Sequence, residues 1–257
     1  MKKTRKPWIR RMGYLRDQDG IMNRYLRERK GWDPHLNRTK AFINQSLRRE
    51  GIQSVAVLGS GWLLDVPLEE MLEHFTTVYL ADIRHPPQIR KRVEGLSGVI
   101  LVETDLSGGI MEQLWRWNRR SSSMDPEEIM DHLVFTPPLG PLQPDAYISV
   151  NLLNQLDIIP CDYLEKSGHF QQQTILRFRT WLQKAHLDWI TTAPGCLITD
   201  TVEINRDKSG HESRKNLIYC NLPSGFRSES WKWEFDTQGT YRSGSLTHME
   251  VRAVEWS

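Results

Sequence analysis

Apolar and polar positions alternate in blocks along most of the chain. The run Val55-Ala56-Val57-Leu58 is continuous and ends in Gly59-Ser60-Gly61, which is typical of a buried strand that enters a tight turn. Comparable apolar segments predict further strands at 77–83, 98–102, 145–153 and 196–204. Between them, apolar residues at helical spacing predict helices at 64–75, 86–93, 109–120 and 170–185.

This regular exchange of strand and helix indicates an α/β fold, because parallel neighbours need a crossover that covers the sheet. The last part of the chain differs. Strand-like segments at 216–222, 231–235 and 247–253 have glycine-containing turns between them and no helix between the last two. We therefore expect a doubly wound, mostly parallel seven-stranded sheet with an antiparallel C-terminal hairpin.

The region before the first strand has a different pattern. Residues 14–50 carry apolar positions at helical spacing among many basic residues, and Gly31-Trp32-Asp33-Pro34 predicts a break between two short helices, with Asp33 as the N-cap of the second. We expect an N-terminal helical cap over residues 1–50, a Rossmann-like domain over 51–257, and a long irregular connection over 121–144.

Charge is unevenly distributed along the 257 residues. Residues 1–50 contain 15 Lys or Arg and 5 Asp or Glu, whereas the remainder contains 19 and 27. A basic N-terminal region favours an anionic partner such as RNA, or is a solvated helical face. Three widely spaced cysteines without a CxxC pair, no apolar run of membrane-spanning length and no secretion signal lead us to expect a soluble cytoplasmic protein with no membrane partner.

Ligands of open parallel sheets bind at the carboxyl ends of the strands, so the loops after the first four strands carry the informative residues. Gly59 and Gly61 allow a tight turn and close approach of a ligand, or serve packing alone. Asp82 stands 21 residues after Gly61 at a strand end, where a carboxylate can accept hydrogen bonds from ribose hydroxyls, or is simply exposed.

The next loop contains Asp105 in the segment ETDLSGG. Its carboxylate and the backbone N–H of Leu106 could bind an adenine edge, or Asp105 could cap the helix that begins near Gly108. The eight histidines lack HExxH or another pair at metal-ligand spacing, so we expect no metal site.

The segments VAVLGSG, LADI, VETD and ISVNLLNQL, with a closing hairpin, resemble the successive motifs of class I S-adenosylmethionine-dependent methyltransferases. The resemblance covers residues 55–159 and, more loosely, 196–256. It implies S-adenosyl-L-methionine as the cofactor and a set of cofactor-binding residues: Gly59, Ser60, Gly61, Asp82, Ile83, Asp105, Leu106 and Asn151. The chain departs from the family at Val57, where an acid is usual, and at Leu63, where a third glycine is usual; Asp65 is a candidate substitute carboxylate, or an ordinary acid in the first turn of a helix.

The resemblance implies methyl transfer to an unidentified acceptor, which can be a small molecule, a protein or RNA. The pattern identifies no general base. Asn151 can orient the acceptor or the cofactor amine, or it can satisfy local backbone groups, and Trp32 and His35 are candidate lid contacts or packing residues. Two alternatives stay open: an NAD(P)-dependent oxidoreductase, which would share the glycine turn and the acid, and a non-catalytic Rossmann-like adaptor.

Overall fold

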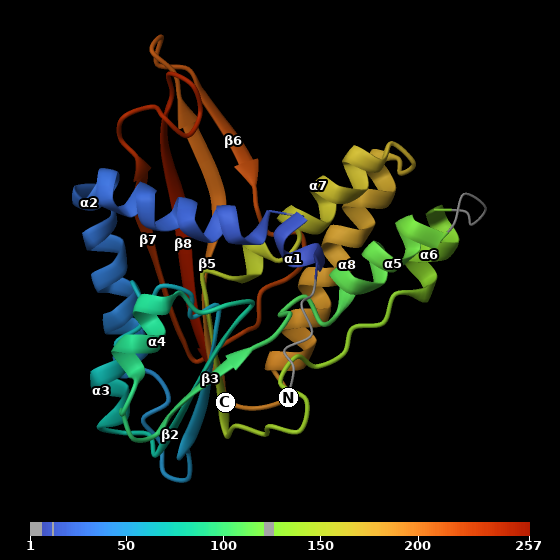
Figure 1. Ribbon diagram of the computed structural model, residues 1–257. Coiled ribbons are helices and arrows are strands. Elements are labelled where there is room, and N and C mark those ends of the chain that lie inside the picture. The colour runs from blue at the N-terminus through green and yellow to red at the C-terminus, as the bar shows by residue number, and fades with distance from the viewer. Residues whose placement is uncertain (1–6, 12, 121–125) are drawn as a thin grey trace.

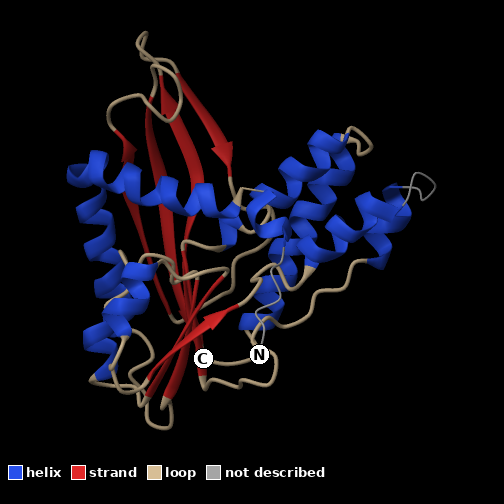
Figure 2. Ribbon diagram, viewed as in Figure 1, coloured by secondary structure: helices blue, strands red, loops and turns tan. Residues whose placement is uncertain are grey.

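The computed structural model describes residues 7–11, 13–120 and 126–257. In these ranges the chain forms one central sheet with helices on both faces (Figures 1 and 2). Seven strands follow the path β3-β2-β1-β4-β5-β8-β7. Their bounds are β1 Ser54–Leu58, β2 Thr77–Asp82, β3 Val99–Glu103, β4 Ala146–Val150, β5 Gly195–Arg206, β7 Arg227–Asp236 and β8 Leu246–Trp256.

The first five strands are mutually parallel, and β8 runs antiparallel between β5 and β7. An additional strand, β6 (Glu212–Asn216), pairs with the outer half of β5 and lies off this path. The prediction of a doubly wound, mostly parallel sheet with an antiparallel C-terminal hairpin is confirmed. The described ranges contain eight strands, one more than the seven that were expected.

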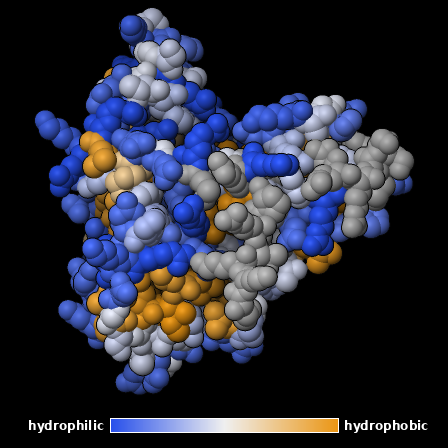
Figure 3. Space-filling model, in the orientation of Figure 1, coloured by the Kyte–Doolittle hydropathy of each residue, from blue (hydrophilic) through white to orange (hydrophobic). Residues whose placement is uncertain are grey.

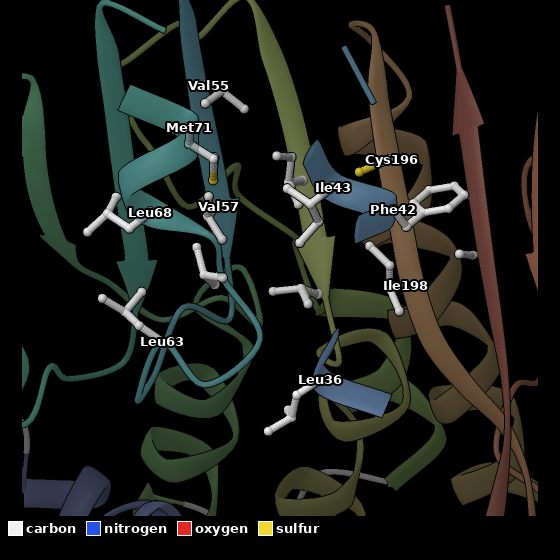
Figure 4. Packing of buried hydrophobic residues seen from close by; sticks show 14 of the residues in the cluster. Leu36, Phe42, Ile43, Val55, Val57, Leu63, Leu68, Met71, Cys196 and Ile198 are labelled. Atoms are coloured by element: carbon white, nitrogen blue, oxygen red, sulfur yellow. The ribbon is translucent and has the colours of Figure 1, made fainter. Parts of the chain in front are cut away.

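The alternation of side chains along each strand divides the core between the two faces of the sheet. Val55 and Val57 of β1 belong to one buried cluster, whereas Ala56 and Leu58 belong to the other. The first cluster is closed by α2 (Tyr14–Gln45), α3 (Leu68–Leu72) and α4 (Pro87–Val93), and part of it is seen in Figure 4. The second is closed by α5 (Ile110–Arg120), α6 (Pro126–His132), α7 (Ile158–Ser167) and α8 (Gln172–Ile190).

Several predicted boundaries were wrong. The helix expected at 64–75 is reduced to α3, because Pro67 restricts the residue before it and the helix begins only after the proline. The strand expected to reach residue 153 ends at Val150, since Asn151 takes a left-handed conformation (φ 47°) and a short 3-10 helix, η1 (Leu153–Gln155), follows. α6 lies inside the connection expected to be irregular, whose residues 121–125 are outside the described ranges.

The sequence pattern also misplaced one strand and missed one helix. Residues 217–222, expected as part of a strand, form a loop held by Gln183 of α8, which donates to the Leu217 carbonyl (2.9 Å) and accepts from the Tyr219 N–H (2.8 Å). The strand in this region is β6, which is exposed throughout and has no apolar alternation to reveal it. The sequence pattern did not predict α7. Pro160 lies in its first turn, where backbone N–H groups have no partner within the helix, so the proline costs no helix hydrogen bond.

The N-terminal region forms a short helix, α1 (Pro7–Arg11), and the 32-residue helix α2. The predicted break at residues 31–34 is wrong: α2 continues through Pro34 and departs from helical geometry at Glu28. The Glu28 carboxylate fixes this kink by accepting hydrogen bonds from the N–H (2.9 Å) and hydroxyl (2.7 Å) of Thr237. α2 therefore runs across the molecule from α1 and turns at the kink to pack along the sheet (Figure 1).

No helix in the described part of the chain is long and apolar enough to cross a membrane. The face seen in Figure 3 is mostly hydrophilic, and its apolar residues gather at the end of the molecule where α3, β2 and β3 lie.

The contact between α2 and β7 generates a prediction about Gly31. A Cβ at residue 31 would lie 2.5 Å from the carbonyl oxygen of Glu234, so no side chain fits there without displacing the strand backbone. We expect Gly31→Ala to lower the free energy of unfolding by about 1–3 kcal/mol, as overpacking does. Urea unfolding followed by tryptophan fluorescence measures this change.

Gly20 of the same helix is the matched control, because a Cβ there meets nothing within 4 Å. Gly20→Ala should be neutral or should stabilise by about 0.5–1 kcal/mol through helix propensity. Equal effects of the two substitutions would contradict close packing at Gly31.

Candidate functional site

The loops that follow β1, β2, β3 and β4 meet at one edge of the sheet. Leu58, the last residue of β1, lies beside Ala81 of β2 and Ser149 of β4, and Asp82 lies beside Glu103 of β3. The strand order reverses between β2-β1 and β4-β5, so this edge is the topological switch point of the sheet. The structure thus brings the predicted site segments together.

The backbone of the glycine loop is tied to the end of β2. The N–H groups of Gly59 (3.0 Å) and Ser60 (3.2 Å) both donate to the Ala81 carbonyl, and the Gly61 N–H donates to Asp82 Oδ2 (2.9 Å). These amides already have partners within the chain, and α3 begins only at Leu68. The loop therefore does not present the free helix N-terminus that would bind an anionic group.

The two glycines serve different purposes. A Cβ on Gly59 (φ 86°) would lie 2.9 Å from the Val150 carbonyl and 3.1 Å from Leu152 Cβ, so this glycine is required by packing against the end of β4. Gly61 (φ 37°) faces Asp82 Oδ2, which a Cβ would meet at 3.6 Å. The turn at Gly61 is what brings its amide to the Asp82 carboxylate.

Asp82 is held by its own surroundings. Its half-buried carboxylate accepts hydrogen bonds from the backbone N–H groups of Gly61, Ile83 and Arg84, while burial raises its pKa to about 6. A carboxylate has about four acceptor positions, so roughly one remains for a hydroxyl group of a ligand. Ile83, the next residue, is also half-buried and is positioned beside this carboxylate by the chain.

Behind the glycine loop lies a buried pair that the sequence did not reveal. Ser60 Oγ donates to the Ala81 carbonyl (3.3 Å) and lies 3.1 Å from His85 Nε2. Burial lowers the pKa of His85 to about 4, so the ring is neutral and its Nε2–H donates to Ser60. Its Nδ1 is then an acceptor, and no described residue donates to it. The signal in the sequence was a single histidine three residues after Asp82.

Asp105 organises the start of α5. Its Oδ1 accepts hydrogen bonds from the Ser107 N–H (3.0 Å) and hydroxyl (2.6 Å) in the loop before α5, so Asp105 is not the N-cap of this helix, which begins at Ile110; the Ser107 Oγ in turn accepts from the Met111 N–H (3.4 Å). The Leu106 side chain is 5% exposed and packs into the second core cluster. Burial raises the pKa of the Tyr14 phenol of α2, and the negative charge of Asp105 raises it further.

The first part of α2 covers the loops after β1 and β2. The Gln18 side chain donates to the Arg84 carbonyl (2.7 Å), and Trp62 Nε1 donates to the Gln18 carbonyl (2.8 Å). Of the two candidate lid residues, His35 reaches Asn151, whereas Trp32 donates to the Phe235 carbonyl (2.9 Å) and packs against β7.

A second polar group surrounds Asn151 at the switch point. The Asn151 side-chain amide lies 2.7 Å from Asp65 Oδ2 and 3.3 Å from His35 Nε2. Trp231 Nε1 donates to His35 Nδ1 (3.1 Å), and burial lowers the pKa of His35 to about 3. His35 is therefore neutral and carries its proton on Nε2.

This proton couples the state of Asp65 to the orientation of the Asn151 amide, which is assigned from the hydrogen bonds it makes. If the Asn151 NH2 group points toward Asp65 and His35, it donates to the Asp65 carboxylate, but the His35 Nε2–H then faces another donor. If the Asn151 oxygen points toward them instead, it accepts the His35 proton, and Asp65 must be protonated to donate to it. Burial raises the pKa of Asp65, in the direction of the second state. Asp65 lies in the loop before α3 rather than in the first turn of a helix, and its role as a substitute carboxylate stays a prediction.

The structure adds Asp200 to this edge. It lies just beyond the part of β5 that pairs with β4, is 3% exposed, and accepts one hydrogen bond from Asn154 (3.2 Å). Burial raises its pKa to about 7, and the charges of Asp65 and Glu203 act in the same direction. In the sequence, Asp200 lies inside the segment 196–204 that was predicted as a strand, so the pattern gave no reason to single out this acid.

No cluster of three or more His, Cys, Asp or Glu side chains suited to a metal occurs among the residues that the structure describes. Two hollows lie away from the predicted site residues. One of about 420 Å³ borders Thr201, Trp231 and Lys232. The other, of about 370 Å³, lies between Leu47 and Phe75.

Comparison with known proteins gave solved structures with a similar course of the chain. One is the crystal structure of the N-methyltransferase NodS from Bradyrhizobium japonicum WM9 in complex with S-adenosyl-L-homocysteine, at 12% identity and a TM-score of 0.35 over 84% of this chain and 85% of that chain. Another is 1,6-didemethyltoxoflavin-N1-methyltransferase from Burkholderia thailandensis with bound 1,6-didemethyltoxoflavin and S-adenosylhomocysteine, at 11% identity and 0.39 over 93% and 87%. No family model and no curated protein matches the chain.

The strand order, with β8 antiparallel between β5 and β7, is the mostly parallel sheet with a closing hairpin that the sequence predicted. At this level of identity and TM-score the likeness assigns no activity. The function has to be argued from the residues at the edge of the sheet.

The buried Asp200 carboxyl predicts a specific pH dependence of stability. A folded-state pKa raised to about 7 contributes stability that is present below the unfolded-state pKa and lost as the pH rises through about 7. Asp200→Asn removes this loss, so between pH 4 and pH 8 its free energy of unfolding should gain on the wild type by on the order of 2–4 kcal/mol. Urea unfolding at several pH values measures the difference.

Asp145 provides a control of opposite sign, because hydrogen bonds from Ser54 lower the pKa of its exposed carboxyl. Asp145→Asn should cost stability at neutral pH, and this cost should shrink as the solution becomes acidic. A pH-independent difference between Asp200→Asn and the wild type would show that Asp200 is not a buried titrating group.

Proposed function

We propose that this protein is an S-adenosylmethionine-dependent methyltransferase whose acceptor is not yet identified. The observation that carries the proposal is the direct contact of the glycine loop with the acid after β2, Gly61 N–H to Asp82 Oδ2 at 2.9 Å, at the switch point of the sheet. That edge is where open α/β sheets bind nucleoside-containing ligands.

The sheet favours this cofactor over a nicotinamide dinucleotide. Dinucleotide-binding domains of the doubly wound type consist of two mononucleotide-binding halves. In the second half, strands four, five and six are parallel neighbours. Here the antiparallel β8 lies between β5 and β7 and takes the place of the second half. The engaged amides of the glycine loop also leave no cradle for a pyrophosphate.

The residues present fit an adenosyl group joined to an amino acid. Asp82 retains an acceptor position for a ribose hydroxyl, and the half-buried Ile83 offers an apolar surface beside it. On the other side of the switch point, the ionised state of Asp65, with the Asn151 NH2 group toward it, leaves acceptor oxygens of both residues for an ammonium group. Asp105 and Leu106 contribute at the adenine end by shaping the loop before α5, and the charge of that carboxylate reaches the Tyr14 phenol.

The cofactor supplies an activated methyl group, so the protein's task is alignment, exclusion of water and electrostatic support. The first part of α2 contributes to exclusion of water by covering the loops after β1 and β2 through Gln18 and Trp62. The cover is a candidate for the slow conformational step of the reaction.

A non-catalytic adaptor is the second candidate, and one observation favours it. The amides of Gly59 and Ser60 are bonded to the Ala81 carbonyl, and Gly59 is packed against Leu152, as in a turn that serves packing alone. Cofactor binding distinguishes the two candidates.

Isothermal titration of the purified protein with S-adenosylhomocysteine, NADH and NADPH tests the proposal. We expect only S-adenosylhomocysteine to bind. Asp82→Asn keeps an acceptor for the Gly61 amide but loses the charge, and should weaken S-adenosylhomocysteine by about 10- to 100-fold, the value of one charge-assisted hydrogen bond.

Asp188→Asn, on the exposed face of α8, is the control and should bind as the wild type does. Binding of NADH alone would establish the oxidoreductase alternative. Absence of binding by all three nucleotides would favour the adaptor, and an unchanged affinity of Asp82→Asn would remove Asp82 from the site.

A further inference from the structure

The Asp200 carboxyl group is an unusual buried acid because one of its oxygens has no partner. Oδ2 accepts from the Asn154 amide (3.2 Å), but no described residue donates to Oδ1, although the side chain is only 3% exposed. A buried carboxylate oxygen without a donor costs several kcal/mol, so such an atom in a folded protein needs an explanation. A bound ligand that donates to it provides one.

The neighbouring groups define the chemistry of that ligand. Asp200 feels the negative charges of Asp65 and Glu203. Glu203 is neutralised by its ion pair with Arg242 (2.9 Å). Asp65 feels the positive charge of Lys40 of α2, but Asp65 and Lys40 form no ion pair in the described structure. With the Asn151 NH2 group toward Asp65, the oxygen of that amide is likewise buried without a donor. Acceptors therefore outnumber donors at this end of the site.

A group with positive charge and several N–H donors matches this surplus of acceptors. A metal ion does not, because the described residues offer no set of three or more ligating side chains there. The fitting ligand is an ammonium group.

The position of Asp200 indicates which molecule carries it. The nucleoside contacts proposed above lie at β1, β2 and β3, and Asp65 and Asn151 lie at the switch point next to them. Asp200 follows on β5, one strand beyond β4 on the side away from the nucleoside. The group it holds therefore lies on the acceptor side of the reacting methyl group.

We propose that the methyl acceptor is an amine and that Asp200 is the catalytic carboxylate that holds its nitrogen. This inference rests on the proposed function. The acceptor arrives as an ammonium ion, gives one proton to Asp200 and is then an amine with a lone pair. That lone pair forms the bond to the methyl carbon while the carbon–sulfur bond breaks, and its electron pair stays on sulfur as the neutral thioether.

The methylated product carries the positive charge that the sulfonium loses, and the proton on Asp200 leaves to solvent. Asn154 acts as a positioning residue, because its hydrogen bond to Oδ2 directs Oδ1 of the same carboxyl group toward the amine.

Three nucleoside probes test the proposal by binding alone. S-adenosylhomocysteine lacks the methyl group, 5′-methylthioadenosine keeps a methyl group on sulfur but lacks the amino acid, and sinefungin places an ammonium where the transferred methyl would be. We expect the wild type to bind sinefungin at least tenfold more tightly than S-adenosylhomocysteine. Asp200→Asn should lose that preference and keep its affinity for S-adenosylhomocysteine within about twofold.

Other outcomes overturn the proposal in distinguishable ways. If Asp200→Asn weakens S-adenosylhomocysteine but leaves 5′-methylthioadenosine unchanged, Asp200 holds the cofactor's own ammonium. If all three affinities are unchanged, Asp200 contacts neither ligand. If the wild type binds none of the probes, the proposed function and this inference fail together.

Two further variants guard against a folding defect. Asp200→Ser should give the same loss of preference, and circular dichroism with thermal unfolding identifies any variant that does not fold. Asp65→Asn is the matched comparison: it should weaken S-adenosylhomocysteine and sinefungin equally, because Asp65 lies on the cofactor side of Asn151.

Discussion

The hydrogen bonds between the loop after β1 and the end of β2 are the interaction on which the candidate site depends. The carbonyl of Ala81 accepts from two successive amides and the Asp82 carboxylate accepts from a third. These contacts fix the positions of the glycine turn, the acid and the buried Ser60–His85 pair relative to one another. The occupied hydrogen-bonding groups of the site consequently lie at β1 and β2, whereas the side-chain oxygens without a donor, those of Asn151 and Asp200, lie at β4 and β5.

Much of the fold was predictable because buried parallel strands leave a strong signal. β1, β2 and β3 are short apolar runs, and α4 and α5 carry apolar residues at helical spacing, so their positions were found almost to the residue. The failures arose where local pattern and tertiary contact disagree. β6 is polar throughout and forms only because β5 offers an edge, while the left-handed Asn151 ends β4 two residues before its apolar pattern stops.

The site could be predicted only in part for a related reason. A pattern identifies residues that follow strands, which led to Asp82 and Asn151. It does not show which acceptors are already occupied, as in the glycine loop, or which acid inside a strand lacks a donor, as at Asp200. Both properties depend on contacts between strands far apart in sequence, and only coordinates reveal them.

The packing of α2 has a consequence for the order of events during synthesis. Trp32 bonds to the Phe235 carbonyl across 203 residues, and Glu28 bonds to Thr237 across 209. A nascent chain folds from its N-terminus as it leaves the ribosome, and the first part of α2 can already contact the loops after β1 and β2, but the segment around Glu28 and Trp32 lacks these partners until β7 has emerged. The middle of this helix thus settles late, and the Trp32 side chain, which packs against Trp233 and Phe235, stays open to chaperones or to aggregation until the C-terminal hairpin has been made.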